Sequence, residues 1–118
     1  MADSRYVPRD YALNPLHFGS LTKLVQWREN MTSVADLDRL RAAQAQHKYA
    51  HLIRSSIRSS GPGTTKAFAE VNRLNYARFS RMLRGEIIMR LEDVATAERL
   101  LPGVFAPASR PNGLVESY

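Results

Sequence analysis

The apolar residues of this 118-residue chain recur at the spacing of α-helices and nowhere alternate as in strands. Towards the N-terminus, one apolar stripe predicts a helix over residues 20–29; it consists of Leu21, Leu24 and Val25. Asn14 followed by Pro15 is a further helix start, since proline suits the first helical position. Residues 1–13 show no periodicity, and we expect them to be irregular.

A long helix is predicted over residues 33–60. Thr32 or Ser33 can cap it, and Asp36 stands three residues after Ser33, as in a capping box with aspartate for glutamate. Its apolar stripe weakens in the stretch "RAAQAQHK", so the pattern allows one continuous helix or two with a break near 44–47. The glycines and proline of "SSGPG" end it.

Three shorter helices are predicted in the second half, over residues 65–72, 76–84 and 90–101. Thr64 or Thr65 caps the first of them. The four residues "NRLN" form a turn between the first and the second. Gly85 stands where a helix usually ends in a left-handed residue. The fold class is therefore all-α, a five- to six-helix bundle.

The distribution of charge adds a functional hint. The chain has a net charge of +6, and residues 54–90 alone carry eight Lys/Arg against two Asp/Glu, a balance of +6. Clustered positive charge is the footprint of a nucleic-acid-binding protein, and a solvated surface is the alternative. No apolar run reaches the roughly 20 residues of a membrane span. Together with the absence of a signal-peptide pattern, this favours a cytoplasmic protein.

Candidate chemistry is sparse. There are no cysteines, which excludes disulfides, cysteine zinc sites and a cysteine nucleophile. The histidines are His17, His47 and His51. The last two are spaced i,i+4, but no carboxylate or cysteine completes a metal site, so we expect packing roles. "GPG" lacks the Lys-Ser/Thr context of a phosphate loop. We expect no enzyme, no cofactor and no metal.

The helix over residues 76–84 separates apolar from basic positions. At 100° per residue, one arc of about 120° holds the apolar side chains: Tyr76, Phe79, Met82 and Leu83. The opposite arc holds the rest: Ala77, Arg78, Arg81 and Arg84. Two short helices joined by a short turn, the second basic on one side, describe a helix-turn-helix. Ala69 permits a close approach of the two helices, and Leu74 is placed to plug the turn.

Residues 49–101 resemble the Cro/C1-type (lambda-repressor-like, XRE) helix-turn-helix DNA-binding family. The matches hold one register along this stretch and fall at six places: Ile57-Arg58, Phe68-Ala69, Asn75, Phe79, Gly85 and Leu91-Glu92. Arg73 stands where the family usually has glycine, so Arg73 adopts a positive φ or the turn differs. Leu83 replaces an acidic residue that in the family pairs with the arginine matched by Arg58.

The resemblance implies sequence-specific binding of double-stranded DNA by a transcriptional regulator, in most cases a repressor and often a homodimer. Such proteins are encoded by bacteria, phages or plasmids. The implied base-reading residues are Asn75, Tyr76, Ala77, Arg78 and Arg81. The implied phosphate-contacting residues are Thr65, Lys66, Arg73, Arg84, Arg90 and Arg58. A bidentate contact from Arg81 to guanine is worth roughly 1–3 kcal/mol of discrimination.

On this interpretation the chain has three parts. Residues 46–103 form the helix-turn-helix DNA-binding domain, and residues 1–45 are a helical extension. Residues 104–118 are an irregular tail in which Val104 and Phe105 reach the core. The extension either packs as a cap on the same core or forms a dimer interface.

Two further functions compete with this one. The first is an antitoxin-type protein-interaction module that neutralises a toxin through the N-terminal helices and autoregulates its operon. The second is a non-specific nucleic-acid or RNA binder, which the scarcity of stacking aromatics on the basic face disfavours.

Overall fold

The computed structural model describes residues 6–61 and 63–106, and all regular structure in them is helical. Two 3₁₀-helices and four α-helices follow in order: η1 (Pro8–Tyr11), η2 (Pro15–His17), α1 (Val34–Ser59), α2 (Thr65–Val71), α3 (Tyr76–Leu83) and α4 (Leu91–Leu100). The all-α class is confirmed, whereas the expected count of five or six α-helices is not. Most of the tail predicted to be irregular, residues 107–118, lies outside the described residues.

Helix α1 is one continuous element of 26 residues, so no break occurs near 44–47. It begins at Ser33, whose side chain accepts a hydrogen bond from the N–H of Asp36 at 3.0 Å. Its buried side follows the helical repeat: Ala43, Gln46, Ala50, Ile53 and Ile57. The domain boundary predicted between residues 45 and 46 falls inside this helix and stays a prediction.

The helix predicted over residues 20–29 is absent, and that prediction was wrong. Ser20 Oγ accepts hydrogen bonds from the N–H groups two and three residues on, as a helix cap does, but no helix follows it. Farther along, an isolated antiparallel β-bridge joins Trp27 to Ala12. The apolar stripe is not buried as a unit, since Leu24 is 87% exposed. Tertiary packing has therefore overridden the local pattern.

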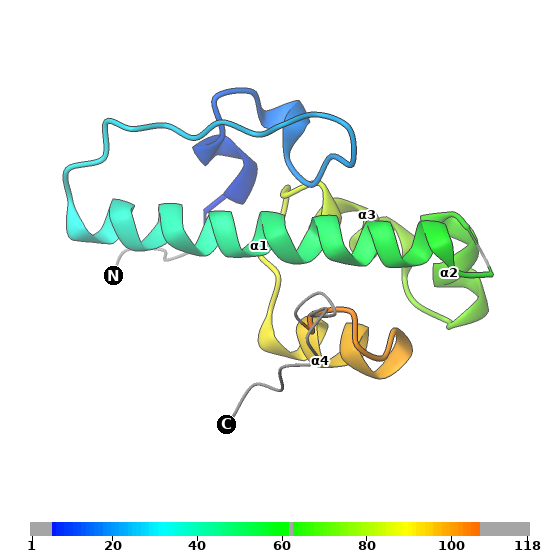
Figure 1. The fold of residues 1–118 in the computed structure, drawn as a ribbon. Coiled ribbons are helices and arrows are strands. Elements are labelled where there is room, and N and C mark those ends of the chain that lie inside the picture. Colours follow the sequence, from blue (N-terminus) through cyan, green and yellow to red (C-terminus); the bar gives the residue numbers. More distant parts are fainter. Residues whose placement is uncertain (1–5, 62, 107–118) are drawn as a thin grey trace, which may run out of the picture.

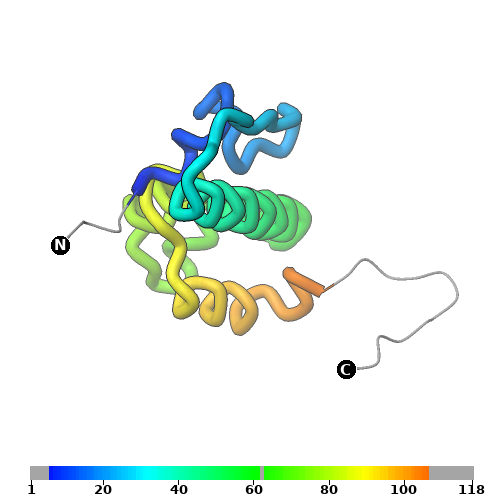
Figure 2. The backbone as a smooth tube through the Cα atoms, turned by 90° about the vertical axis from the view of Figure 1, so that its left-hand side faces the viewer, coloured from blue at the N-terminus to red at the C-terminus, as the bar shows by residue number. Residues whose placement is uncertain are grey.

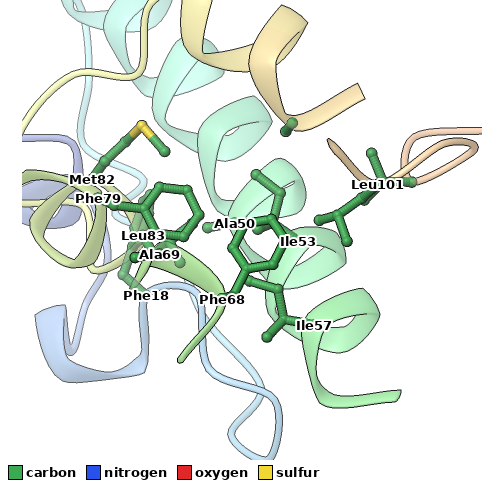
Figure 3. Close-up of a cluster of buried hydrophobic side chains, with 12 residues drawn as sticks. Phe18, Ala50, Ile53, Ile57, Phe68, Ala69, Phe79, Met82, Leu83 and Leu101 are labelled. Atoms are coloured by element: carbon green, nitrogen blue, oxygen red, sulfur yellow. The ribbon is translucent and has the colours of Figure 1, made fainter. Parts of the chain in front are cut away.

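The core lies between α1 and the three shorter helices. Figure 3 shows side chains from these elements and from the N-terminal segment meeting over α1: Phe18, Ala50, Ile53, Ile57, Phe68, Ala69, Phe79, Met82, Leu83 and Leu101. Beyond α4, Val104 is buried, and the Phe105 ring lies 4.8 Å from that of Tyr49, centroid to centroid. The prediction that Val104 and Phe105 reach the core is confirmed.

The N-terminal segment packs on the side of α1 opposite α4 (Figures 1 and 2). Its anchor is Phe18, only 2% exposed, whose ring makes edge contacts with Trp27 and His47. The N–H of Arg9 donates to the carbonyl of Gly85 at 3.0 Å, directly after α3. The segment therefore packs on the core, and the dimer interface stays a prediction. Within the described residues, no helix is long and apolar enough to cross a membrane.

Candidate nucleic-acid interface

The candidate interface is built on α2, α3 and the turn between them. Thr64 caps α2 by accepting a hydrogen bond from the N–H of Ala67 at 3.2 Å. The turn returns to α2 through the N–H of Leu74, which donates to the carbonyl of Ala69 at 2.8 Å. Leu74 is partly buried against the core, as expected of a residue that plugs the turn.

The turn contains the one non-glycine residue with positive φ among the described residues, Arg73 at 59°. Arg73 stands where the resembled family has glycine, and the first of the two predicted outcomes is confirmed. For an L-residue the left-handed conformation costs roughly 1–2 kcal/mol. The side chain of Arg73 is exposed, so the turn holds a cation at the surface.

Both ends of α3 are fixed by local bonds. Asn75 caps its start, and its Oδ1 accepts from the N–H of Arg78 at 3.0 Å. At the other end, Gly85 has φ 76° and donates to Met82, while the next N–H donates to Arg81. This pair of bonds is the Schellman arrangement, and it confirms the left-handed cap predicted at Gly85.

Helix α3 buries one face and exposes the other. Phe79, Met82 and Leu83 are buried in the core. The residues on the other side are exposed: Asn75, Tyr76, Ala77, Arg81 and Arg84. Tyr76, predicted with the apolar arc, is 40% exposed, so its ring belongs to this surface.

Arg78 is the exception on the basic arc. Its guanidinium forms a bidentate pair with Asp93 of α4, with N–O distances of 2.8 and 2.9 Å. Asp93 also accepts from the N–H of Arg90 at 2.8 Å. Burial alone would raise the pKa of Asp93, but these hydrogen bonds outweigh it and hold the pKa below its usual value. Arg78 therefore joins α3 to α4.

The carboxylate of Glu86 lies close to three arginines, two of which are at the end of α3. Its carboxylate lies 2.7 Å from Arg84, 3.5 Å from Arg81 and 3.7 Å from Arg9. The hydrogen bond from Arg84, with added attraction from Arg9 and Arg81, lowers the pKa of Glu86. One carboxylate serves three guanidinium groups, so this end of α3 stays positively charged.

The predicted phosphate-contacting residues lie on several elements around α3. Thr65 and Lys66 open α2, where free N–H groups and the helix dipole favour an anion. Arg58 is exposed in the last turn of α1, and the buried Leu83 offers it no carboxylate. Arg90 is exposed before α4 but lies 3.8 Å from both Glu92 and Asp93.

Several side chains that shape this region were not predicted from the sequence. Arg54 of α1 is half-buried and shares a pocket with Arg84, directly after α3, and Gln46 holds the last turn of α3 and the segment after it by three hydrogen bonds. Two of the histidines, His47 and His51, pack and bond to the N-terminal segment. Among the described residues, no cluster of three or more metal-ligating side chains is present.

Comparison of the chain with protein-family models, with curated proteins and with solved structures finds no match. The resemblance to the Cro/C1-type family therefore stays a prediction, which depends on the residues named above.

Proposed function

We propose that the protein is a sequence-specific double-stranded-DNA-binding regulator, acting as a transcriptional repressor, that places α3 in the major groove. The observation that carries the proposal is the exposed face of α3, which offers Tyr76, Ala77 and Arg81 opposite a fully buried apolar face. A helix with one free face of this kind fits a groove about 12 Å wide. The short preceding helix and its turn support the helix-turn-helix interpretation.

The side chains on α3 suit different tasks. Arg81 can reach guanine O6 and N7 with two donors, and Ala77 can contact a thymine methyl group. The Oδ1 atom of Asn75 is used by the cap, which leaves its amide N–H₂ as a donor. Arg78, held by Asp93, serves in this proposal to set the angle between α3 and α4 rather than to read a base.

The cations around α3 would bind the backbone. The proposed phosphate contacts are Thr65, Lys66, Arg58, Arg73, Arg84 and Arg90. Each phosphate neutralised by a cation makes the fall of log K with log salt steeper by about 0.9 for duplex DNA. These contacts would therefore give salt-dependent affinity that is the same for all sequences.

Selection of duplexes from a random library, followed by fluorescence anisotropy at low and moderate salt, tests the proposal. A homodimer should enrich palindromes with half-sites about one helical turn apart. Arg81→Ala should weaken binding to the enriched duplex by about 5- to 150-fold and relax one base position. Arg41→Ala, an exposed arginine early in α1, is the matched control. Failure to enrich any sequence, or equal effects of both variants, would refute the proposal.

A second candidate function, an antitoxin that binds a toxin through the N-terminal segment, is favoured by exposed leucines there. Leu16 and Leu24 are 81% and 87% exposed, so their side chains are accessible to a partner protein. Co-expression with the product of the adjacent gene tests this function. Recovery of a complex that Leu16→Ser and Leu24→Ser disrupt would support it, and rescue of growth by the chain without a complex would contradict it.

A further inference from the structure

A pocket lies where the N-terminal segment, α1 and the end of α3 meet. Its volume is about 340 Å³, at the lower end of the range for small-molecule sites. Three arginines from three separate elements line it: Arg9, Arg54 and Arg84. Ser20 and Thr22 are also part of the lining, which contains no acidic residue.

Arg54 is the unusual member of this group. Its Nε atom is buried and has no hydrogen-bond partner among the described residues. A guanidinium group stays charged in proteins, and a buried donor without a partner is destabilising. Burial, and then the nearby charge of Arg84, lower the pKa of Arg54. The Nε–H of Arg54 is therefore a charged donor for which the described residues supply no acceptor.

The acidic residue next to these arginines, Glu86, does not supply the acceptor that Arg54 lacks. Glu86 pairs with Arg84 at 2.7 Å and with Arg9 at 3.7 Å, but it is not part of the pocket lining and no bond joins it to Arg54. Three guanidinium groups and one carboxylate leave a charge of +2. A small anion in the pocket would supply the missing charge.

We propose that this pocket binds a phosphate group, held by the guanidinium groups of Arg9, Arg54 and Arg84. Arginine suits this task because its planar donors match two phosphate oxygens at once. The phosphate belongs either to a free ion or phosphoester or to the backbone of bound DNA. The site itself needs no base-specific contact, so it stands independently of the function proposed above.

The first experiment uses the full chain without DNA. Sodium phosphate is titrated into ¹⁵N-labelled protein, with sodium chloride at equal ionic strength as the reference. Phosphate should give saturable shifts of the Arg54 Nε–H signal and of the Ser20 amide. Arg54→Gln should weaken phosphate binding about 10-fold or more, since charged hydrogen bonds are lost. Arg41→Gln, which removes the same charge from an exposed site on α1, should leave it unchanged.

A second variant guards against loss of folding. Arg84 is exposed, so Arg84→Gln should keep the fold while it also weakens phosphate binding. Non-saturable shifts, shifts that chloride reproduces, or wild-type affinity in both pocket variants would overturn the proposal.

A third measurement identifies the source of the phosphate. If DNA supplies it, inorganic phosphate should compete with a random-sequence duplex, and Arg54→Gln should reduce the salt slope by about 1. If a free ligand supplies it, Arg54→Gln should weaken phosphate binding as above and leave the affinity for that duplex unchanged. Because phosphate binding is measured without DNA, failure of the DNA-binding proposal and failure of this one are separate results.

Discussion

Gln46 is the polar side chain buried most deeply in the described structure, and its replacement is a sharp test of the fold. The residue is 5% exposed in the middle of α1. Its Nε2 donates to the carbonyls of Met82 at 3.1 Å and Ile87 at 2.8 Å, and its Oε1 accepts from the N–H of Met89 at 2.8 Å. One side chain thus fixes the path of the chain from α3 towards α4.

Gln46→Leu keeps the size of the side chain and removes all three hydrogen bonds. The carbonyl of Ile87 and the N–H of Met89 are left without partners, whereas the carbonyl of Met82 keeps the bond from the N–H of Gly85. At about 1 kcal/mol for each bond, the free energy of unfolding should fall by about 3 kcal/mol. This is a large part of the roughly 5–15 kcal/mol typical of a domain.

Urea denaturation followed by circular dichroism measures this loss. Gln44→Leu is the matched control, because Gln44 lies on the same helix, is partly exposed and forms no side-chain hydrogen bond with the described residues. It should change the free energy of unfolding by less than about 0.5 kcal/mol. If the free energy of unfolding of Gln46→Leu also changed by less than about 0.5 kcal/mol, the three bonds would not hold the segment in place.

Gln46→Glu separates the donor role from the acceptor role. A carboxylate can accept from Met89 but would face the carbonyls of Met82 and Ile87, which disfavours the charged form and raises its pKa in the folded state. The variant should therefore be most stable below about pH 4.3, the pKa of an unfolded glutamate. Its stability, relative to wild type, should fall as the pH rises through the raised folded value.

Three further predictions follow from the glycine cap, the turn and a histidine. In Gly85→Ala, the new Cβ would lie 2.6 Å from the Phe18 ring at a positive φ, so the free energy of unfolding should fall by about 2–4 kcal/mol in urea. Arg73→Gly should raise it by about 0.5–1 kcal/mol, because the relief of left-handed strain exceeds the entropy cost of glycine; an unchanged melting temperature would contradict this. His47 accepts from the N–H of Gly19 at 2.8 Å, and burial, with a neighbouring histidine, lowers its pKa. Its contribution should be present above about pH 6.5 and lost as the pH falls through the lowered value; His47→Leu should flatten this dependence between pH 7 and 5.

Local signals predicted the helices after residue 33 well. Ser33 caps α1, Gly85 ends α3, and the apolar positions Phe79, Met82 and Leu83 of α3 are buried as their spacing predicts. These features act over a few residues, so a single sequence contains them. The false helix over 20–29 had a correct apolar spacing, but Phe18 and Trp27 pack on α1 in an extended segment instead. The contacts that override the helix join residues far apart in the chain, so no local sequence pattern reveals them.

The candidate site was predictable only in part. The two faces of α3 follow from its sequence, whereas the pairing of Arg78 with Asp93 depends on how α4 returns to α3. Gln46 was hidden for a different reason: a hydropathy pattern scores glutamine as surface, and the three partners that permit its burial lie about 40 residues away. Arg54 was hidden in the same way, because an arginine pattern does not distinguish a solvated cation from a buried one.

The bond between the main chains of Arg9 and Gly85 has a consequence for the timing of folding during synthesis. The ribosome makes the N-terminal segment first, yet its partner at the end of α3 emerges only after most of the chain. Because synthesis adds about 5–20 residues per second, several seconds pass between the synthesis of Phe18 and that of Gly85, against which Phe18 packs. During that interval α1 can form alone, but its apolar side is uncovered, so the nascent chain has a window in which a chaperone or a second chain competes for it.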